Sequence, residues 1–250
     1  MSVKQFVRRR FQKLGVDLVR FDPGHHYLAR RRQLFNTYGI TLVLDVGASA
    51  GEYTEEIRRL GYKGRIVSYE PLSSVYSVLW KKAQADELWD TYRCALGEKE
   101  EQTFINIAGN SDSSSLLNML PLHVQSAPES KYVGQELINV VTLDSVFDAI
   151  CNADDNVYLK IDVQGYESRV LRGAEKALRR IDTIQIEMSL KPLYADSPLF
   201  DEMHELMSKQ KYQLVSIEPG HESRESGELL QFDAIYHRCE HSPAFNESAE

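Results

Sequence analysis

The stretch Leu42–Thr54 most constrains the fold of this chain, because it combines an apolar run, a glycine turn and the start of a helix. It reads LVLDVGASAGEYT. The apolar run ends at Gly47, Gly51 follows, and a helical pattern then begins. A short apolar run before a glycine turn is typical of a buried parallel strand. Glycine lets the backbone turn tightly and approach a ligand closely, so the stretch predicts a small-molecule site.

Two acidic residues accompany this stretch. Asp45 lies inside the apolar run, where a carboxylate is costly to bury without a polar partner or a ligand. Glu70 ends the next apolar strand, which is predicted at 65–69. An acid and a glycine turn after one strand, with a second acid after the next, form the pattern that methyltransferases use for S-adenosylmethionine (SAM). In that pattern the second acid binds the ribose hydroxyls.

Two other enzyme classes and a ligand-free turn compete with this interpretation. A dinucleotide-binding enzyme would carry G-x-G-x-x-G, but here Ser49 stands at the middle place. Residues 47–51 match the G-x-S-x-G of serine hydrolases, yet only about 40 residues precede the serine, and no oxyanion-hole motif is seen. SAM has no phosphate and does not require the third glycine. We therefore favour SAM, while the other interpretations stay open on this stretch alone.

Length and charge set the domain organisation. A chain of 250 residues suits one α/β domain with an appendage. Residues 1–32 hold nine Lys or Arg and two Asp, so they carry +7, and the remainder carries −15. The basic part could contact a membrane surface, whereas the acidic body argues against a nucleic-acid partner. Three distant cysteines predict neither a disulfide nor a metal site, and without a signal peptide we expect a cytoplasmic protein.

Strand and helix patterns alternate along the chain and predict a three-layer α/β domain. Val3–Arg20 has amphipathic spacing, which predicts packing on a sheet edge or, as the alternative, contact with a membrane. Ser73 or Ser74 is the predicted cap of a helix that runs to about Asp86. Further helices are predicted at 27–38, 52–60, 142–150, 166–179 and after Pro198. Strands are predicted at 42–46, 65–69, 91–95, 102–107, 136–141, 157–161, 183–186, 212–218 and 229–237, with a hairpin after 91–95 and an antiparallel last pair.

The segment 109–128 differs from the rest, because it is first polar and then apolar without a regular period. Long loops in compact domains are usually functional or mobile, so a lid or acceptor-binding loop is expected here. His123 within it is a possible base, although an exposed surface histidine is the simpler expectation. Beyond this loop, Asp162 and Glu187 follow two further buried strands. With Asp45 and Glu70 they place four acids at one crevice, where ligands of such sheets bind.

The assembled motifs resemble the FkbM family of SAM-dependent methyltransferases. The most specific block is LKIDVQGYE at 159–167, and the matching pieces recur in family order across roughly residues 40–237. The other pieces are LVLDVGASAGEYT (42–54), IVSYEP (66–71), ALG (95–97), SSSL (113–116), VTLD (141–144), VLRGA (170–174) and IQIE (184–187). One departure is Ser49, where family members often carry Asn.

The resemblance implies a Rossmann-like class I methyltransferase fold with a mostly parallel seven-stranded sheet and an antiparallel last strand. The domain would span 39–240, after a basic helical arm at 1–38 and before a flexible tail at 241–250. The implied reaction is methyl transfer from SAM to a hydroxyl, typically of a sugar in a glycan, a lipopolysaccharide or a natural product. The implied SAM-binding residues are Asp45, Gly47, Ala48, Ser49, Gly51, Tyr53, Thr54, Glu70, Pro71, Ala95 and Leu96.

Methyl transfer to an alcohol needs a base in addition to the cofactor. Asp162 is the first candidate, because it follows the strand next to the expected methyl position, and Glu187 is the second. Lys160 and Glu167 could support them, or pair with each other or with solvent. No third oxygen ligand is evident, so no metal is expected. A dinucleotide-dependent oxidoreductase, or a non-catalytic protein that binds glycans or partners on the same fold, is the alternative.

Overall fold

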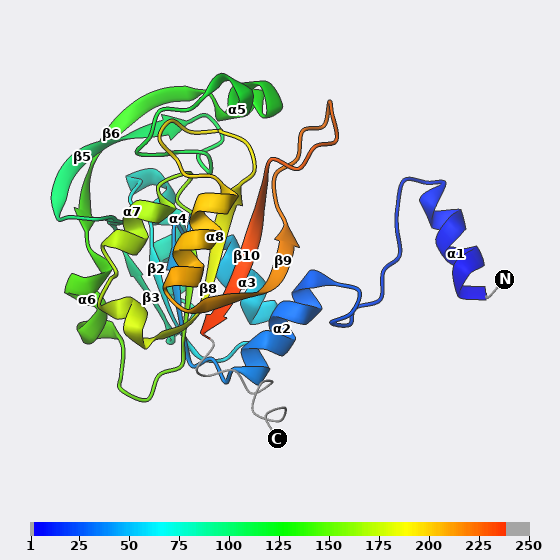
Figure 1. The fold of residues 1–250 in the computed structure, drawn as a ribbon, viewed down its shortest axis with the longest axis horizontal. Helices are drawn as coiled ribbons and strands as arrows, with labels where there is room; N and C mark the ends of the chain where they lie inside the picture. Colours follow the sequence, from blue (N-terminus) through cyan, green and yellow to red (C-terminus); the bar gives the residue numbers. More distant parts are fainter. Residues whose placement is uncertain (1–2, 239–250) are drawn as a thin grey trace.

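The computed structural model describes residues 3–238, and its centre is a seven-stranded sheet (Figure 1). The strand order is β3-β2-β1-β7-β8-β10-β9, and the strands are β1 (Leu42–Val46), β2 (Arg65–Tyr69), β3 (Trp89–Tyr92), β7 (Val157–Ile161), β8 (Ile181–Ser189), β9 (Tyr212–Pro219) and β10 (Gln231–Arg238). β3, β2, β1, β7 and β8 pair in parallel, whereas β10 is antiparallel to both of its neighbours. The predicted sheet, with its reversed last strand, is therefore confirmed.

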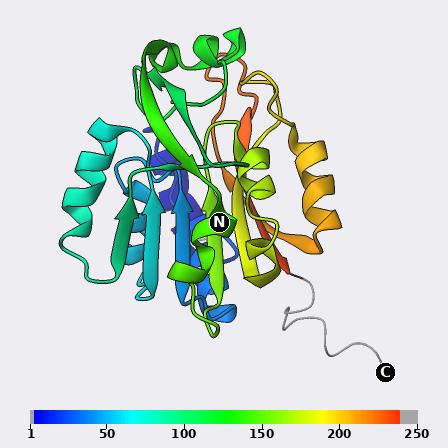
Figure 2. The ribbon, with the colours of Figure 1, turned by 90° about the vertical axis from the view of Figure 1, so that its left-hand side faces the viewer.

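Helices cover both faces of this sheet and complete the three predicted layers (Figures 1 and 2). Residues of α2 (Tyr27–Thr37), α3 (Glu52–Arg59) and α4 (Ser73–Ala83) pack on one face; those of α6 (Leu143–Ile150), α7 (Glu167–Arg172) and α8 (Phe200–Lys209) pack on the other. In β1, Val43 joins the first group, and Leu42 and Leu44 join the second. Successive strand residues point to opposite faces, so one continuous apolar strand serves both cores.

A second sheet corrects the predicted hairpin after the third strand. β3 ends at Tyr92, and the next residues form β4 (Ala95–Leu96) in a three-stranded sheet with β5 (Glu101–Ala108) and β6 (Tyr132–Val141). β5 pairs with β6 in antiparallel register, not with β3. The sheet lies with α5 (Pro121–Ser126) beyond the carboxyl ends of the parallel strands (Figure 2). The apolar pattern located β5 and part of β6, but the strand predicted at 91–95 is divided between β3 and β4 in different sheets. The true partner of β5 is β6, which is distant in the sequence.

Two helix predictions were wrong in their details, and both corrections involve distant contacts. Ser73 is the first residue of α4 and not its cap, because the Glu136 carboxylate accepts hydrogen bonds from its backbone N (3.0 Å) and hydroxyl (3.1 Å). The helix predicted at 166–179 ends at Arg172, and a 3₁₀ turn, η2 (Ala177–Arg180), follows. There Asp144 accepts hydrogen bonds from the backbone N of Lys176 and Ala177.

The N-terminal region has two unlike parts. α1 (Val3–Gln12) lies away from the sheet at the end of an extended segment (Figure 1), so the expected packing on a sheet edge is wrong. α2, in contrast, buries Phe35 and Arg31 against the domain. Within residues 3–238, no helix is long and apolar enough to cross a membrane. The predicted tail at 241–250 and Cys239 lie outside the described residues.

Candidate active site

A cavity of about 510 Å³ opens at the carboxyl ends of β1, β2 and β7. Its size falls within the range of roughly 300–1,000 Å³ that is usual for small-molecule sites. The cavity brings together most of the predicted site residues, namely Gly47, Ala48, Ser49, Tyr53, Glu70, Pro71, Ala95, Leu96, Asp162 and Glu187. Asp45, Gly51 and Thr54 do not line it and lie behind the wall that these residues form.

The two glycines of the turn are needed for close packing. Gly47 has φ +78°, and a Cβ there would lie 1.8 Å from the backbone O of Asp162. The turns after β1 and β7 can therefore touch only if residue 47 is glycine. Gly51 has φ +90°, and its Cβ would lie 2.7 Å from the Trp89 ring. Gly51 thus allows the start of α3 to pack closely against the core, and it does not itself line the cavity.

Asp45 lies beneath the turn and acts on it through Lys160. Its carboxylate is fully buried, and neither oxygen has a hydrogen-bond partner among the described residues. Burial raises the pKa of Asp45, and the Lys160 ammonium 3.4 Å away opposes that rise. Lys160 also donates to the backbone O of Gly47 at 3.3 Å. Thr54 on α3 is also buried, and its hydroxyl has no hydrogen-bond partner within residues 3–238.

Glu70 joins the turn to the end of β2. Its carboxylate accepts hydrogen bonds from the backbone N of Ser49 (3.1 Å) and of Leu72 (2.9 Å). Burial raises the pKa of Glu70 to about 7, although these two donors oppose the rise. Ser49 has φ 45°, in the left-handed region, and this conformation turns its N–H toward Glu70. The carboxylate therefore stands on the cavity wall, as a ribose-binding acid must.

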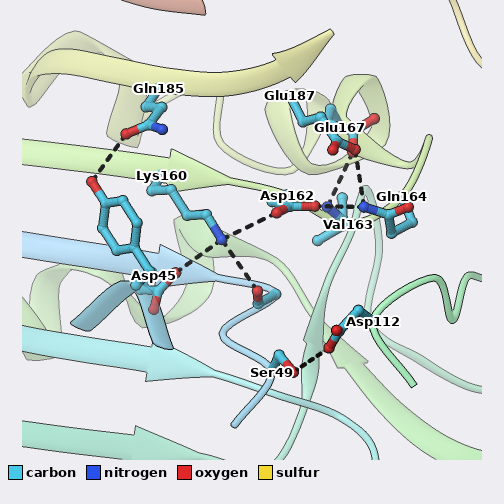
Figure 3. A network of polar contacts seen from close by, with 12 residues as sticks. Asp45, Ser49, Asp112, Lys160, Asp162, Val163, Gln164, Glu167, Gln185 and Glu187 are labelled. Carbon is cyan, nitrogen blue, oxygen red and sulfur yellow. Dashed lines mark hydrogen bonds and ion pairs between the residues drawn. The ribbon is translucent and has the colours of Figure 1, made fainter. Parts of the chain in front are cut away.

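A network of polar contacts lies on the next strands (Figure 3). Lys160 lies 3.4 Å from Asp162, and Gln164 donates to Asp162 (2.8 Å) and to Glu187 (3.0 Å) through the same amide nitrogen. Gln231 also donates to Glu187 at 2.8 Å. Burial, and then the nearby Asp162 and Glu167 carboxylates, raise the pKa of Glu187 well above its ordinary value. Gln164 thus joins the two carboxyl groups, and Lys160 lies beside Asp162.

Two further acids complete a row across the sheet, and the sequence did not reveal them. The register places Asp233 of β10 opposite Glu187 of β8, and Glu218 of β9 opposite Asp233. Both line the cavity. Asp233 was missed because β10 runs in the opposite direction, so its residues at this edge come early in the strand. The predicted antiparallel pairing was the signal that could have located it.

Arg31 of α2 was also missed and lies in the same wall. Its guanidinium binds the Glu218 carboxylate through two nitrogens, donates to Glu56 at 2.6 Å and covers the Tyr53 ring at 4.9 Å. The residue is only 4% exposed. No local motif marks this residue, because its partner is 187 positions away.

The loop after β5 forms the opposite wall of the cavity, and its role as a lid or acceptor-binding loop stays a prediction. Ser49 donates from its hydroxyl to Asp112 at 2.8 Å, which connects the loop to the glycine turn. A second connection is made by Ser115, whose hydroxyl donates to the backbone O of Gln164 at 2.7 Å. Tyr194 donates to the Gln164 side chain at 2.7 Å. Gln164 thus contacts both candidate bases and the loop.

His123 is not the exposed histidine that was expected. It is 3% exposed, does not line the cavity, and stands edge-on to Tyr194 with ring centroids 5.0 Å apart. Burial lowers its pKa to about 4. The geometry gives it no access to a substrate in this cavity, so nothing supports its role as a base.

The cavity therefore has an apolar part and a hydrogen-bonding part. Leu72, Val75, Leu96, Ile105 and Leu116 line the side near Glu70, while the acids of β7, β8, β9 and β10 line the other. The first part suits an adenosine with its ribose on Glu70, and the glycine turn lies between the two. This donor set, on a seven-stranded sheet with a reversed strand, defines a class I SAM-dependent methyltransferase.

A comparison with protein-family models identifies the family. The model described as the methyltransferase FkbM domain matches residues 45–214. The chain belongs to this family, and its cofactor is SAM. The resemblance drawn from the motifs is thereby confirmed, and the oxidoreductase and hydrolase interpretations are set aside. In agreement, Ser49 donates to a carboxylate and not to a histidine.

Solved structures with this fold are similar only at a distance. An rRNA methylase from Streptococcus thermophilus is 9% identical, with a TM-score of 0.46, and the match covers 87% of this chain and 96% of that chain. Fibrillarin from Aeropyrum pernix, solved with natively bound SAM, is 8% identical, with a TM-score of 0.45 and coverage of 78% and 66%. A search of curated proteins finds no significant match.

Proposed function

We propose that this methyltransferase transfers the methyl group of SAM to a hydroxyl of a sugar, with Asp162 as the base. The observation that carries the proposal is the position of Asp162, which lines the same cavity as Glu70 and the glycine turn. Lys160 and Gln164 hold its carboxylate from two sides. A carboxylate fixed in this way can accept the proton of an alcohol that lies within hydrogen-bond reach.

The other residues have separate tasks in this proposal. SAM, when bound, supplies a sulfonium methyl group, which is already a good electrophile. Glu70 holds the ribose hydroxyls, and Glu187 forms a hydrogen bond with the acceptor. Lys160 positions the Asp162 carboxylate and fixes the turn at Gly47. Alignment of the acceptor oxygen with the methyl group then supplies much of the rate enhancement.

The acceptor class is supported by the charge and hydrogen-bonding groups of the cavity. Carboxyl groups at positions 162, 187, 218 and 233 line one row, and the Gln185 amide lies beside them. Such groups hydrogen-bond the hydroxyls of a sugar and repel phosphate-rich acceptors. The FkbM resemblance points to glycans as well. A neutral sugar hydroxyl therefore suits this site better than a nucleic acid.

Calorimetric titration with SAM and a methyl-transfer assay on a panel of neutral and anionic glycosides would test these roles. Glu70→Gln should weaken SAM binding about tenfold, because the ribose hydroxyls lose one acceptor oxygen. Asp162→Asn should bind SAM nearly as well as the wild type but lose turnover by a factor of about 10² to 10⁴.

The control is Asp90→Asn, which changes an exposed acid on β3. Unchanged SAM affinity in Glu70→Gln would contradict the ribose role. Normal turnover in Asp162→Asn would refute the assignment of the base. Transfer to nucleic acid but not to any glycoside would overturn the acceptor class, while leaving the cofactor site intact. Binding of SAM without transfer to any acceptor would favour the non-catalytic alternative.

A further inference from the structure

The segment 6–21, which contains most of α1 and the extended chain after it, exposes an unusual set of side chains. Every large apolar residue in it is between 38% and 78% exposed, and these residues are Phe6, Val7, Phe11, Leu14, Val16, Leu18, Val19 and Phe21. Burying such side chains is worth about 1.5–3 kcal/mol each, so a continuous run left in water points to an interaction surface.

Basic residues are interleaved with these apolar ones. Arg8, Arg9 and Arg10 follow one another in α1, and the Arg10 guanidinium covers the Phe6 ring at 5.2 Å. Val7 and Phe11, four residues apart, share a side of the helix. An amphipathic helix with arginines beside aromatic residues is the type that adsorbs to anionic lipid, burying its apolar side at the headgroup boundary.

The distribution of charge in the chain indicates whether this segment binds a lipid surface or a second copy of the protein. Residues 1–22 hold six Lys or Arg and two Asp, while the chain as a whole carries −8. An attraction of this segment to the acidic body would already act within one chain, at the high effective concentration that a short linker provides. The segment instead extends away from the body (Figure 1). A second copy of the protein, which presents the same acidic surface, is therefore not the expected partner.

We propose that segment 6–21 binds the surface of a membrane that contains anionic lipids. α1 has ten residues and is about 15 Å long, half of the roughly 30 Å hydrocarbon core, so it lies in the interface and does not span it. Tyr27, six residues after Phe21, lines the site cavity. The bound segment would thus hold the cavity near the lipid headgroups, whichever acceptor the enzyme methylates.

Vesicle flotation of the full chain tests this proposal without any knowledge of the acceptor. The vesicles contain phosphatidylcholine alone, or phosphatidylcholine and phosphatidylglycerol in equal parts, at low and high salt. The wild type should float with the anionic vesicles at low salt and much less at high salt. The double variant Phe6→Gln/Phe11→Gln should bind these vesicles at least about tenfold more weakly, because it lacks two aromatic rings that the lipid would bury.

A matched control changes two equally exposed apolar residues elsewhere. Phe104 and Leu137 face each other on β5 and β6 and are 58% and 53% exposed, so Phe104→Gln/Leu137→Gln should bind vesicles like the wild type. Equal SAM affinity in all variants would show that the domain is intact. Absence of vesicle binding by the wild type, or equal binding by the Phe6→Gln/Phe11→Gln variant, would overturn the proposal. So would a dimer, seen by light scattering, that the same variant abolishes.

Discussion

Asp162 follows β7, Glu187 lies on the neighbouring β8, and different groups surround the two side chains. Lys160 lies 3.4 Å from Asp162, whereas Glu187 is surrounded by amide donors and by other carboxyl groups. Burial and the neighbouring carboxyl groups raise the pKa of Glu187. Burial raises the pKa of Asp233 to about 6 as well, with the Asp162 carboxylate adding to the rise. The acids around Asp162 therefore hold their protons more tightly than exposed carboxyl groups do.

Glu167 offers a test of this electrostatic description at a residue away from the chemistry. It is buried and accepts hydrogen bonds from the backbone N of Val163 (3.0 Å) and Gly165 (3.1 Å). Burial raises its pKa to about 7, above the ordinary value of 4.5. The folded state therefore binds this proton more tightly than the unfolded state. The resulting stabilisation is fully present below pH 4.5 and is lost as the pH rises toward 7.

Glu167→Gln keeps an acceptor for both amides and has no proton to lose. The difference in melting temperature between the variant and the wild type should therefore increase by roughly 5 °C or more between about pH 5 and pH 7. Above pH 7 this difference should stay constant. Thermal unfolding across this pH range would measure the difference. Glu202→Gln, on the exposed side of α8, should show no such trend. A difference that is constant with pH would contradict the raised pKa.

At the scale of elements, the break between α7 and η2 positions the site. Gly173 ends α7 with φ −79°, which any residue can adopt, so its requirement is purely steric. A Cβ there would lie 1.9 Å from the backbone O of Gly97, directly after β4. This contact seats α7 against β4, whose Ala95 and Leu96 line the cavity.

Gly173→Ala should therefore destabilise the protein, because backbone atoms must move to admit the methyl group. We expect a loss of about 1–3 kcal/mol in the free energy of unfolding, measured by thermal or denaturant unfolding. The matched control is Gly134→Ala on β6, whose Cβ would meet only the Ile107 Cδ1 at 3.9 Å. It should leave stability nearly unchanged. Equal effects of the two substitutions would show that the contact with Gly97 is not limiting.

At the scale of the whole molecule, the two N-terminal helices differ: α2 packs against the domain, whereas α1 is exposed to solvent. α2 is part of the domain, because Arg31 is buried against Glu218 of β9 and Glu56 of α3. α1 has a comparable ion pair, Arg8 with Asp17 at 2.5 Å, but this pair is exposed. The ion pair of Arg31 is thus buried in the domain, and the ion pair of Arg8 is exposed to solvent.

This contrast predicts two different results for the same substitution. Arg31→Gln leaves a buried carboxylate without its cation, so the free energy of unfolding should fall by about 3 kcal/mol, and the melting temperature by roughly 6–12 °C. Arg8→Gln should leave the melting temperature unchanged, because its ion pair is screened by water. Thermal unfolding of both variants measures this. A loss of stability in Arg8→Gln would mean that α1 packs on the domain after all.

Much of the fold followed from patterns within single segments. The strands 42–46, 65–69 and 157–161 were predicted with the bounds that the structure shows, because each is a short apolar run ended by glycine, proline or an acid. Most of the predicted cofactor residues line the cavity, and Gly47, Ala48, Ser49, Glu70 and Pro71 do so because they directly follow such runs. The roles assigned to them, and the cytoplasmic location, stay predictions.

The sequence by itself thus determined the class of sheet, the glycine turn and the acids at the ends of parallel strands, because each depends on residues adjacent in the chain. Only the tertiary structure decided that β6 is the partner of β5, that Arg31 binds Glu218, and that Asp233 joins the row of acids. These contacts join residues far apart in the sequence. Their formation depends on the register and direction of packed strands, which no local pattern specifies.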